Sequence, residues 1–106
     1  SEAASAQRSR ELSGARLALL RNVDRHAELQ RRGEALIHSL KSKTHEVQQG
    51  RASQSEALKV ELDLLTQNAS ELDSWEEVAI SLIDYRVKAD AFSEGNINLT
   101  LQELGL

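Results

Sequence analysis

The absence of proline is the feature that most constrains this chain, because proline inside a helix removes a hydrogen bond and clashes with the preceding turn. None of the 106 residues is proline, only five are glycine, and Ala, Leu, Glu, Arg, Lys and Gln dominate. Trp75, Tyr85 and Phe92 are the only aromatic residues, too few to anchor a compact globular core. The sequence therefore predicts an all-α protein built from long helices.

Apolar residues recur in steps of three and four, the period of one face of a helix. In the first half these steps also pass through polar residues, which favours a helix in a mixed bundle over a two-stranded zipper. We predict a basic amphipathic helix over residues 7–49 and an acidic one over residues 54–94, after a frayed N-terminus at residues 1–6. The second helix has the better stripe, formed by Leu58, Leu62, Leu65, Ala69, Leu72, Trp75, Ala79 and Leu82.

A stop signal and a start signal meet in the middle of the chain. Gly50 can adopt the left-handed conformation that ends a helix. The segment Ser53-Gln54-Ser55-Glu56 matches the capping box, in which a Ser and a Glu satisfy the unpaired backbone donors of a new helix. We predict a turn at residues 50–53 and a long antiparallel helical hairpin, coiled-coil-like; one uninterrupted helix that tolerates Gly50 is the alternative.

The two halves carry opposite charge. Residues 1–53 hold ten Arg or Lys against six acids, whereas residues 54–106 hold three bases against eleven acids. These counts give +4 and −8, which sum to the formal charge of −4. Helices of opposite charge are expected to lie side by side, or each to meet a complementary helix elsewhere.

Two long helices bury little surface per residue, so a hairpin of this kind is not expected to be stable alone. We expect it to assemble into a helical bundle with other helical subunits or with a second copy of itself. Trp75 is the expected hot spot, because interface energy concentrates in a few large side chains. The predicted protein-interaction residues are Leu12, Leu19, Val23, Ile37, Leu40, Leu58, Leu62, Leu65, Leu72, Trp75, Ala79 and Leu82.

No pattern for catalysis, a cofactor or a metal is found, and the sequence predicts no enzyme. Cysteine is absent, and Glu34 with His38 supplies only two potential metal ligands one turn apart. The basic stretch over residues 8–32 is interleaved with acids and has no aromatic residue for base stacking, so no nucleic acid is expected as a partner. The longest apolar run, residues 17–20, is far too short to span a bilayer. Without a secretory signal pattern or cysteines, we expect an intracellular protein, cytoplasmic rather than nuclear.

Two short stretches resemble part of the helical motif of R-type SNARE proteins. They are Arg32-Gly33-Glu34-Ala35-Leu36, followed by Leu40-Lys41-Ser42-Lys43, and the upstream run Asn22-Val23-Asp24-Arg25. The likeness covers about a fifth of the chain, and its spacing departs from the layer register on which SNARE pairing depends. It implies a SNARE-like helical module and assigns no functional residue.

The last ten residues, INLTLQELGL, crowd apolar side chains into a short tail after Gly95-Asn96, where the second helix is expected to stop. Their spacing resembles a leucine-rich nuclear export signal, a peptide read by a groove, with anchors Ile97, Leu101, Leu104 and Leu106. Another groove-binding role is a further alternative. We expect instead that residues 95–106 form the last apolar contact of the bundle.

Together these patterns predict a non-enzymatic structural or adaptor subunit of a larger intracellular complex. Tethering, trafficking, cytoskeletal and kinetochore-type assemblies all use such helices. The alternatives are a small helical chaperone for assembly or secretion, which would sheathe a partner helix, and the SNARE-like module.

Overall fold

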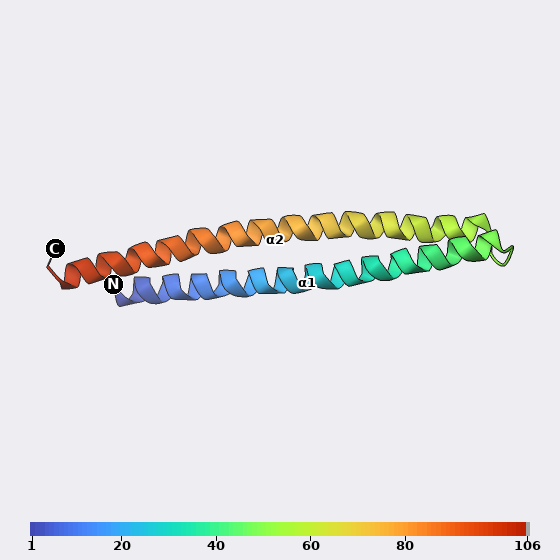
Figure 1. The fold of residues 1–106 in the computed structure, drawn as a ribbon. Helices are drawn as coiled ribbons and strands as arrows, with labels where there is room; N and C mark the ends of the chain where they lie inside the picture. Colours follow the sequence, from blue (N-terminus) through green and yellow to red (C-terminus); the bar gives the residue numbers. More distant parts are fainter. Residues whose placement is uncertain (106) are drawn as a thin grey trace. The chain divides into compact units, whose positions relative to one another are not determined.

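The computed structural model describes residues 1–105, except for the side chains of Leu99 and Thr100. It contains two helices, α1 (Glu2–Gln48) and α2 (Gln54–Glu103), and no strand within the described residues. The helices run antiparallel and are joined by one short turn (Figure 1). The predicted all-α hairpin is confirmed. Neither helix, over its described residues, is long and apolar enough to cross a membrane.

The turn is built from the two local signals that the sequence contains. Gly50 has a φ of 72° and its N–H donates to the carbonyl of Val47 at 3.0 Å, while Arg51 N donates to Glu46 O at 2.8 Å. This pair of bonds is the Schellman ending of a helix. The Ser53 Oγ accepts from Glu56 N, and the Glu56 carboxylate accepts from Ser53 N, both at 3.2 Å. The predicted stop and capping box are both present, and they reverse the chain.

The hairpin divides into two compact units, and each helix contributes to both. Unit 1 comprises Ser1–Val23 and Glu77–Leu106, and unit 2 comprises Asp24–Glu76. In each unit a segment of α1 packs against an antiparallel segment of α2.

Each helix has one inward-facing line of residues, here called the seam, which recurs in alternating steps of three and four. Its members are buried or half-buried. In α1 they are Leu12, Ala15, Leu19, Asn22, His26, Leu29, Gly33, Leu36, Leu40, Lys43 and Val47; in α2 they are Ala57, Val60, Leu64, Gln67, Glu71, Ser74, Val78, Ser81, Tyr85, Lys88, Phe92 and Gly95.

The seam differs from the stripes that the apolar pattern indicates. In α1 the two lines share Leu12, Leu19 and Leu40, but the inward position beside Leu19 is Asn22, and Val23 is exposed. In α2 the residues facing α1 are displaced from the apolar stripe; Leu64 is half-buried whereas Leu65 is exposed. The apolar pattern correctly identifies an apolar face of α2. That face is not the one that packs against α1.

Both predicted outer helix boundaries are wrong. Helix α1 already begins at Glu2, because Ser1 Oγ accepts from Ala4 N at 3.1 Å and caps it. Helix α2 continues through Gly95-Asn96 to Glu103. Gly95 lies in the seam, where a Cβ would be 2.6 Å from Arg8 Nε, so this glycine makes room for a facing side chain. After Gly50, the next positive φ among the described residues is at Gly105 (74°), just beyond the end of α2.

Candidate protein-interaction surface

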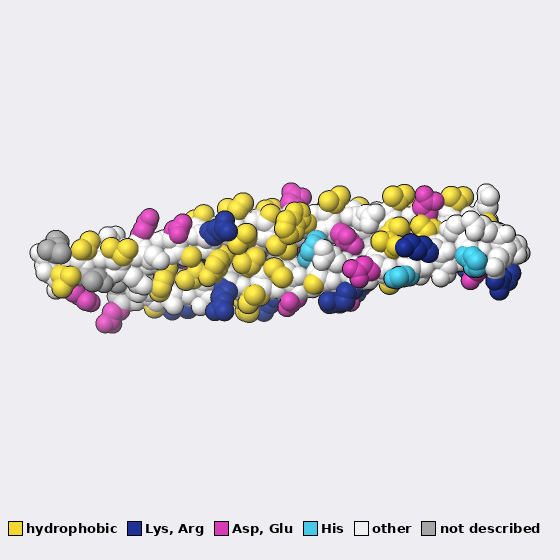
Figure 2. Space-filling model, in the orientation of Figure 1, with side chains coloured by type: hydrophobic (Ala, Val, Ile, Leu, Met, Phe, Trp, Pro, Cys, Tyr) yellow, Lys and Arg dark blue, Asp and Glu magenta, His cyan; other side chains and the backbone are white. Residues whose placement is uncertain are grey.

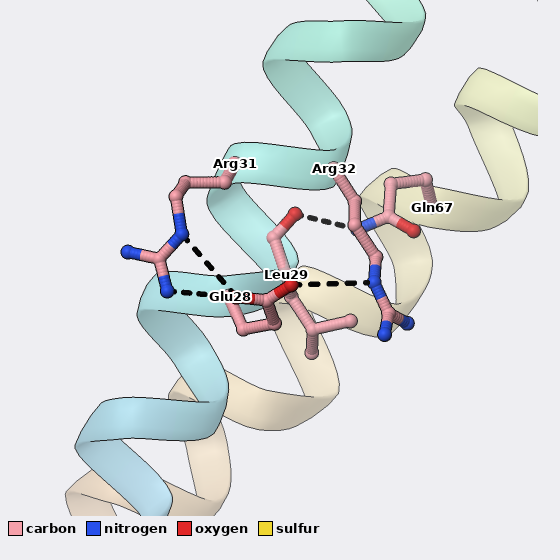
Figure 3. A network of polar contacts seen from close by, with 5 residues as sticks. All are labelled: Glu28, Leu29, Arg31, Arg32 and Gln67. Atoms are coloured by element: carbon pink, nitrogen blue, oxygen red, sulfur yellow. Dashed lines mark hydrogen bonds and ion pairs between the residues drawn. The ribbon is translucent and has the colours of Figure 1, made fainter.

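The seam of unit 2 is unusually polar for the contact between two helices. Gln67 reaches across from α2, and its Nε2 donates to the backbone carbonyl of Leu29 at 2.6 Å (Figure 3). Glu71 lies directly over Gly33 of α1, and a Cβ on Gly33 would collide with the Glu71 carboxylate. Two of the seam positions of α2 in this unit are therefore occupied by long polar side chains instead of apolar contacts.

Two buried polar atoms without hydrogen-bond partners in the described part of the chain further weaken the contact between the helices. Ser74 is 3% exposed, and neither its Oγ nor His26 Nδ1 has a hydrogen-bond partner among the described residues. The His26 ring lies against the Trp75 ring with centroids 5.6 Å apart and planes inclined by 44°. A buried polar group without a partner destabilises a fold by about 1–3 kcal/mol. The contact between α1 and α2 is thus a weak source of stability for unit 2.

The most apolar side of α2 in unit 2 faces away from α1. We call it the outer stripe and define it as Leu58, Leu62, Leu65 and Leu72, whose exposed fractions lie between 60% and 70%. At about 100° per residue, the outer stripe is roughly 140° around the helix from the seam. Large apolar side chains gathered on one exposed face mark an interaction site more often than a solvent-facing surface.

The outer stripe adjoins two features that a partner could contact. Trp75 is 58% exposed and lies between the stripe and the seam. A hollow of about 220 Å³ opens beside Leu58, where Leu40 and Val47 of α1 meet Ala57 of α2. A hollow next to exposed leucines offers a position for an apolar side chain of a partner.

Unit 1 has a more apolar seam, with Ala15 and Val78 buried to 5% and 8% exposure. Its polar contacts are nevertheless of the same kind as in unit 2. Asn22 Nδ2 donates to Ser81 Oγ at 2.6 Å across the helices, and the Arg8 side chain crosses over Gly95. Arg8 Nε is buried and has no hydrogen-bond partner among the described residues.

Unit 1 also leaves apolar side chains uncovered on both of its helices. Leu17, Leu20 and Val23 of α1 are 44–50% exposed. Ile80, Ile83 and Val87 of α2 are 60–63% exposed. On the face shown in Figure 2, hydrophobic side chains reach the surface along both helices, with charged side chains among them. Each unit therefore presents apolar surface that the hairpin itself does not cover.

The predicted interaction residues fall into two groups. The structure brings Leu12, Leu19, Leu40, Ala79 and Leu82 half-way into the hairpin. It leaves the others exposed, namely Val23, Ile37, Leu58, Leu62, Leu65, Leu72 and Trp75. The exposed group is available to a partner, so its role in assembly stays a prediction.

Sequence reasoning missed the polar half of the seam. Gln67, Glu71 and Ser74 face α1, yet each is of a residue type that usually faces solvent. A strict seven-residue repeat would have found them, because 64, 71 and 78 occupy one position of that repeat and 60, 67, 74 and 81 occupy the other.

Helix α2 continues through the predicted tail to Glu103, and three of the four anchor side chains of the tail are exposed. Ile97, Leu101 and Leu104 are 58%, 41% and 67% exposed, and Leu106 lies outside the described residues. The expectation that this segment forms the last apolar contact of the bundle, by folding back or by docking on a sister subunit, stays a prediction. In the hairpin these three side chains are exposed, and they remain accessible to a sister subunit or to a groove of another protein.

Four ion pairs link residues of the same helix. Glu28 accepts from Arg31 at 2.7 Å and lies 3.9 Å from Arg32 (Figure 3). The hydrogen bond and the charge of Arg31, followed by the charge of Arg32, hold the pKa of the Glu28 carboxyl below its ordinary value. The remaining pairs, Lys43–Glu46 at 3.2 Å and Asp84–Lys88 at 3.1 Å, are also local. None of these four pairs neutralises α2 with the charge of α1.

No group of three or more potential metal ligands is found among the described residues. Glu34 and His38 are exposed, and Glu34 borders a hollow with Asn68 and Glu71 of α2. Of the residues in the SNARE-like stretches, those that lie in the seam and face α2 are Asn22, Gly33, Leu36, Leu40 and Lys43. Comparisons with family models, with curated proteins and with solved structures gave no match to the chain.

Proposed function

We propose that this chain is a structural or adaptor subunit, without catalytic activity, that assembles with helices of other proteins in a larger intracellular complex. Tethering, trafficking, cytoskeletal and kinetochore-type assemblies fit this role. The observation that carries the proposal is the distribution of apolar residues in α2. The outer stripe is exposed, while the side that packs on α1 holds Gln67, Glu71 and Ser74.

Burial of the outer stripe would supply the stability that the seam lacks. A leucine side chain transferred from water to a packed contact contributes about 1.5–3 kcal/mol. The outer stripe carries four such side chains, and Trp75 lies beside them. A helix laid along this side of α2 would place α2 between α1 and the partner, as in a three-helix or larger bundle.

A photo-crosslinking amino acid at position 65 tests the proposal in cells that produce the chain. The expected result is an adduct with another protein, lost when Leu62→Asp and Leu72→Asp are introduced together. The matched control carries the crosslinker at Ser39, which is exposed on the polar outer side of α1. Equal adducts from both positions, or none from position 65, would refute the assembly through the outer stripe.

A helical chaperone for assembly or secretion is the second candidate, since an exposed apolar stripe can also sheathe a partner helix. Light scattering and circular dichroism of the purified chain separate the two. A complex subunit is expected to be partly molten or insoluble until it is coexpressed with its partner. A chaperone is expected to be a well-folded dimer on its own.

A further inference from the structure

We infer that the outer stripe of unit 2 takes a basic amphipathic helix of another chain, with apolar residues in a three-four repeat flanked by Lys or Arg. This inference rests on the proposed function and adds the chemistry of the partner to it. It is carried by the charge that surrounds the stripe, in four steps.

The first step concerns the sign of the charge around the outer stripe. Within residues 54–76 of α2, three exposed carboxylates lie beside the outer stripe or in line with it at about 100° per residue, and one exposed base, Lys59, lies further around the helix. The carboxylates belong to Glu61, Asp73 and Glu76. The stripe is therefore an apolar strip with an acidic border.

The second step is that three basic residues of α1 in unit 2 are engaged within their own helix. Arg31 and Arg32 pair with Glu28, and Lys43 pairs with Glu46. The outer stripe also turns away from α1, so the charges beside it face outward. Complementary charge from a partner would lower the repulsion among these carboxylates and guide its approach.

The third step weighs a second copy as the occupant. Packing two outer stripes against each other would bring two acidic borders together, and like charges that face each other disfavour association. The basic α1 of a second copy is also a poor match. In unit 1 its exposed apolar residues, Leu17, Leu20 and Val23, cover about two turns, whereas the outer stripe covers about four.

The fourth step concerns other classes of partner. Nucleic acid and anionic membrane surfaces attract Lys and Arg and repel an acidic border. The leucines of the stripe require an apolar contact as well. A helix that carries both apolar residues and positive charge satisfies both requirements, in the manner of helix-in-groove recognition.

The test uses the full chain and two synthetic helical peptides, labelled for fluorescence anisotropy. Both carry Leu at the a and d positions of four heptads; one has Lys and Arg at the flanking positions and the other has Glu. The basic peptide is expected to bind at least about tenfold more tightly at low salt, with the ratio falling as salt screens the charges. Leu62→Asp with Leu65→Asp should abolish binding of both peptides.

A charge swap sharpens the test. Glu61→Lys with Asp73→Lys should reverse the preference between the two peptides, while Asp24→Lys, at an exposed position of α1 opposite its seam, should leave it unchanged. Equal binding of the two peptides would overturn the basic partner while leaving the stripe as an interface. Binding of neither peptide, or a dimer of the chain in sedimentation that buries Trp75 and excludes both peptides, would also overturn it.

Discussion

The two sides of α2 in unit 2 differ in the kind of side chain that they carry. The inner side packs on α1 with Gln67, Glu71 and Ser74 among its contacts, while the outer side displays four leucines to solvent. In a self-sufficient hairpin the leucines would face inward, because burial of apolar surface is the dominant favourable term in folding. This arrangement is the main support for the proposed assembly through the outer stripe.

The seam of unit 2 owes its geometry to small and polar residues more than to apolar packing. Gly33 admits the Glu71 side chain, and Gln67 caps a backbone carbonyl of the facing helix. Such contacts select one register, since a shift would leave the polar groups without partners. The inner side thus specifies the pairing, and the outer side carries the apolar surface.

The largest difference in the free energy of unfolding is expected between alanine substitutions of two glycines of α1, one in the seam and one outside it. Gly33→Ala places a methyl group against the flexible end of the Glu71 side chain, which must leave the seam, so the free energy of unfolding should be about 1–2 kcal/mol lower than that of Gly14→Ala. Gly14→Ala meets no atom within 4 Å and should raise it by roughly 0.5–1 kcal/mol through helix propensity. Thermal denaturation followed by circular dichroism measures both. Equal effects at the two positions would mean that Gly33 is not in the seam.

A pair of adjacent leucines sharpens the comparison between the two sides of α2. Leu64→Ala removes half-buried contacts with α1 and should lower the free energy of unfolding by about 1–2 kcal/mol. Leu65→Ala, at an exposed position, should change it by less than about 0.5 kcal/mol and weaken partner binding instead. Urea denaturation of the purified chain distinguishes them. The opposite order would place the seam one residue further along.

A buried hydroxyl tests the cost of the polar seam. Ser74→Ala removes an oxygen that is buried without a partner among the described residues, so the melting temperature should rise, with a gain of roughly 1 kcal/mol. Ser70→Ala is the control, because its hydroxyl is exposed and bonds the Thr66 carbonyl of its own helix. A lower melting temperature for Ser74→Ala would show that the hydroxyl makes a stabilising contact.

The smallest effect concerns Glu28, on the exposed side of α1. Its pKa is lowered on folding, so the stabilising contribution is present above the unfolded pKa and is lost as the pH falls through the folded value. NMR titration should give a pKa below the ordinary range, and Arg31→Ala should raise it. A titration that Arg31→Ala leaves unchanged would exclude the hydrogen bond to Arg31 as the cause.

Part of the candidate surface could be read from the sequence. The steps of Leu58, Leu62, Leu65 and Leu72 identify an apolar face of α2, and the acids around them are visible in the composition. Its exposure could not be predicted, because a stripe buried in the hairpin has the same periodicity. The inward positions of Gln67 and Glu71 were hidden for a related reason: polar side chains are ordinarily read as solvent-facing.

The sequence by itself determined the local structure: an unbroken run of helix formers, and a reversal where the Gly50 ending meets the Ser53–Glu56 capping box. These features depend on contacts within a few residues, so the chain order suffices to define them. Only the tertiary structure decided which face of each helix turns inward. The contacts of Glu71 over Gly33 and of Arg8 over Gly95 accompany that choice. Such pairings join residues far apart in sequence, so the pattern along one helix does not reveal them.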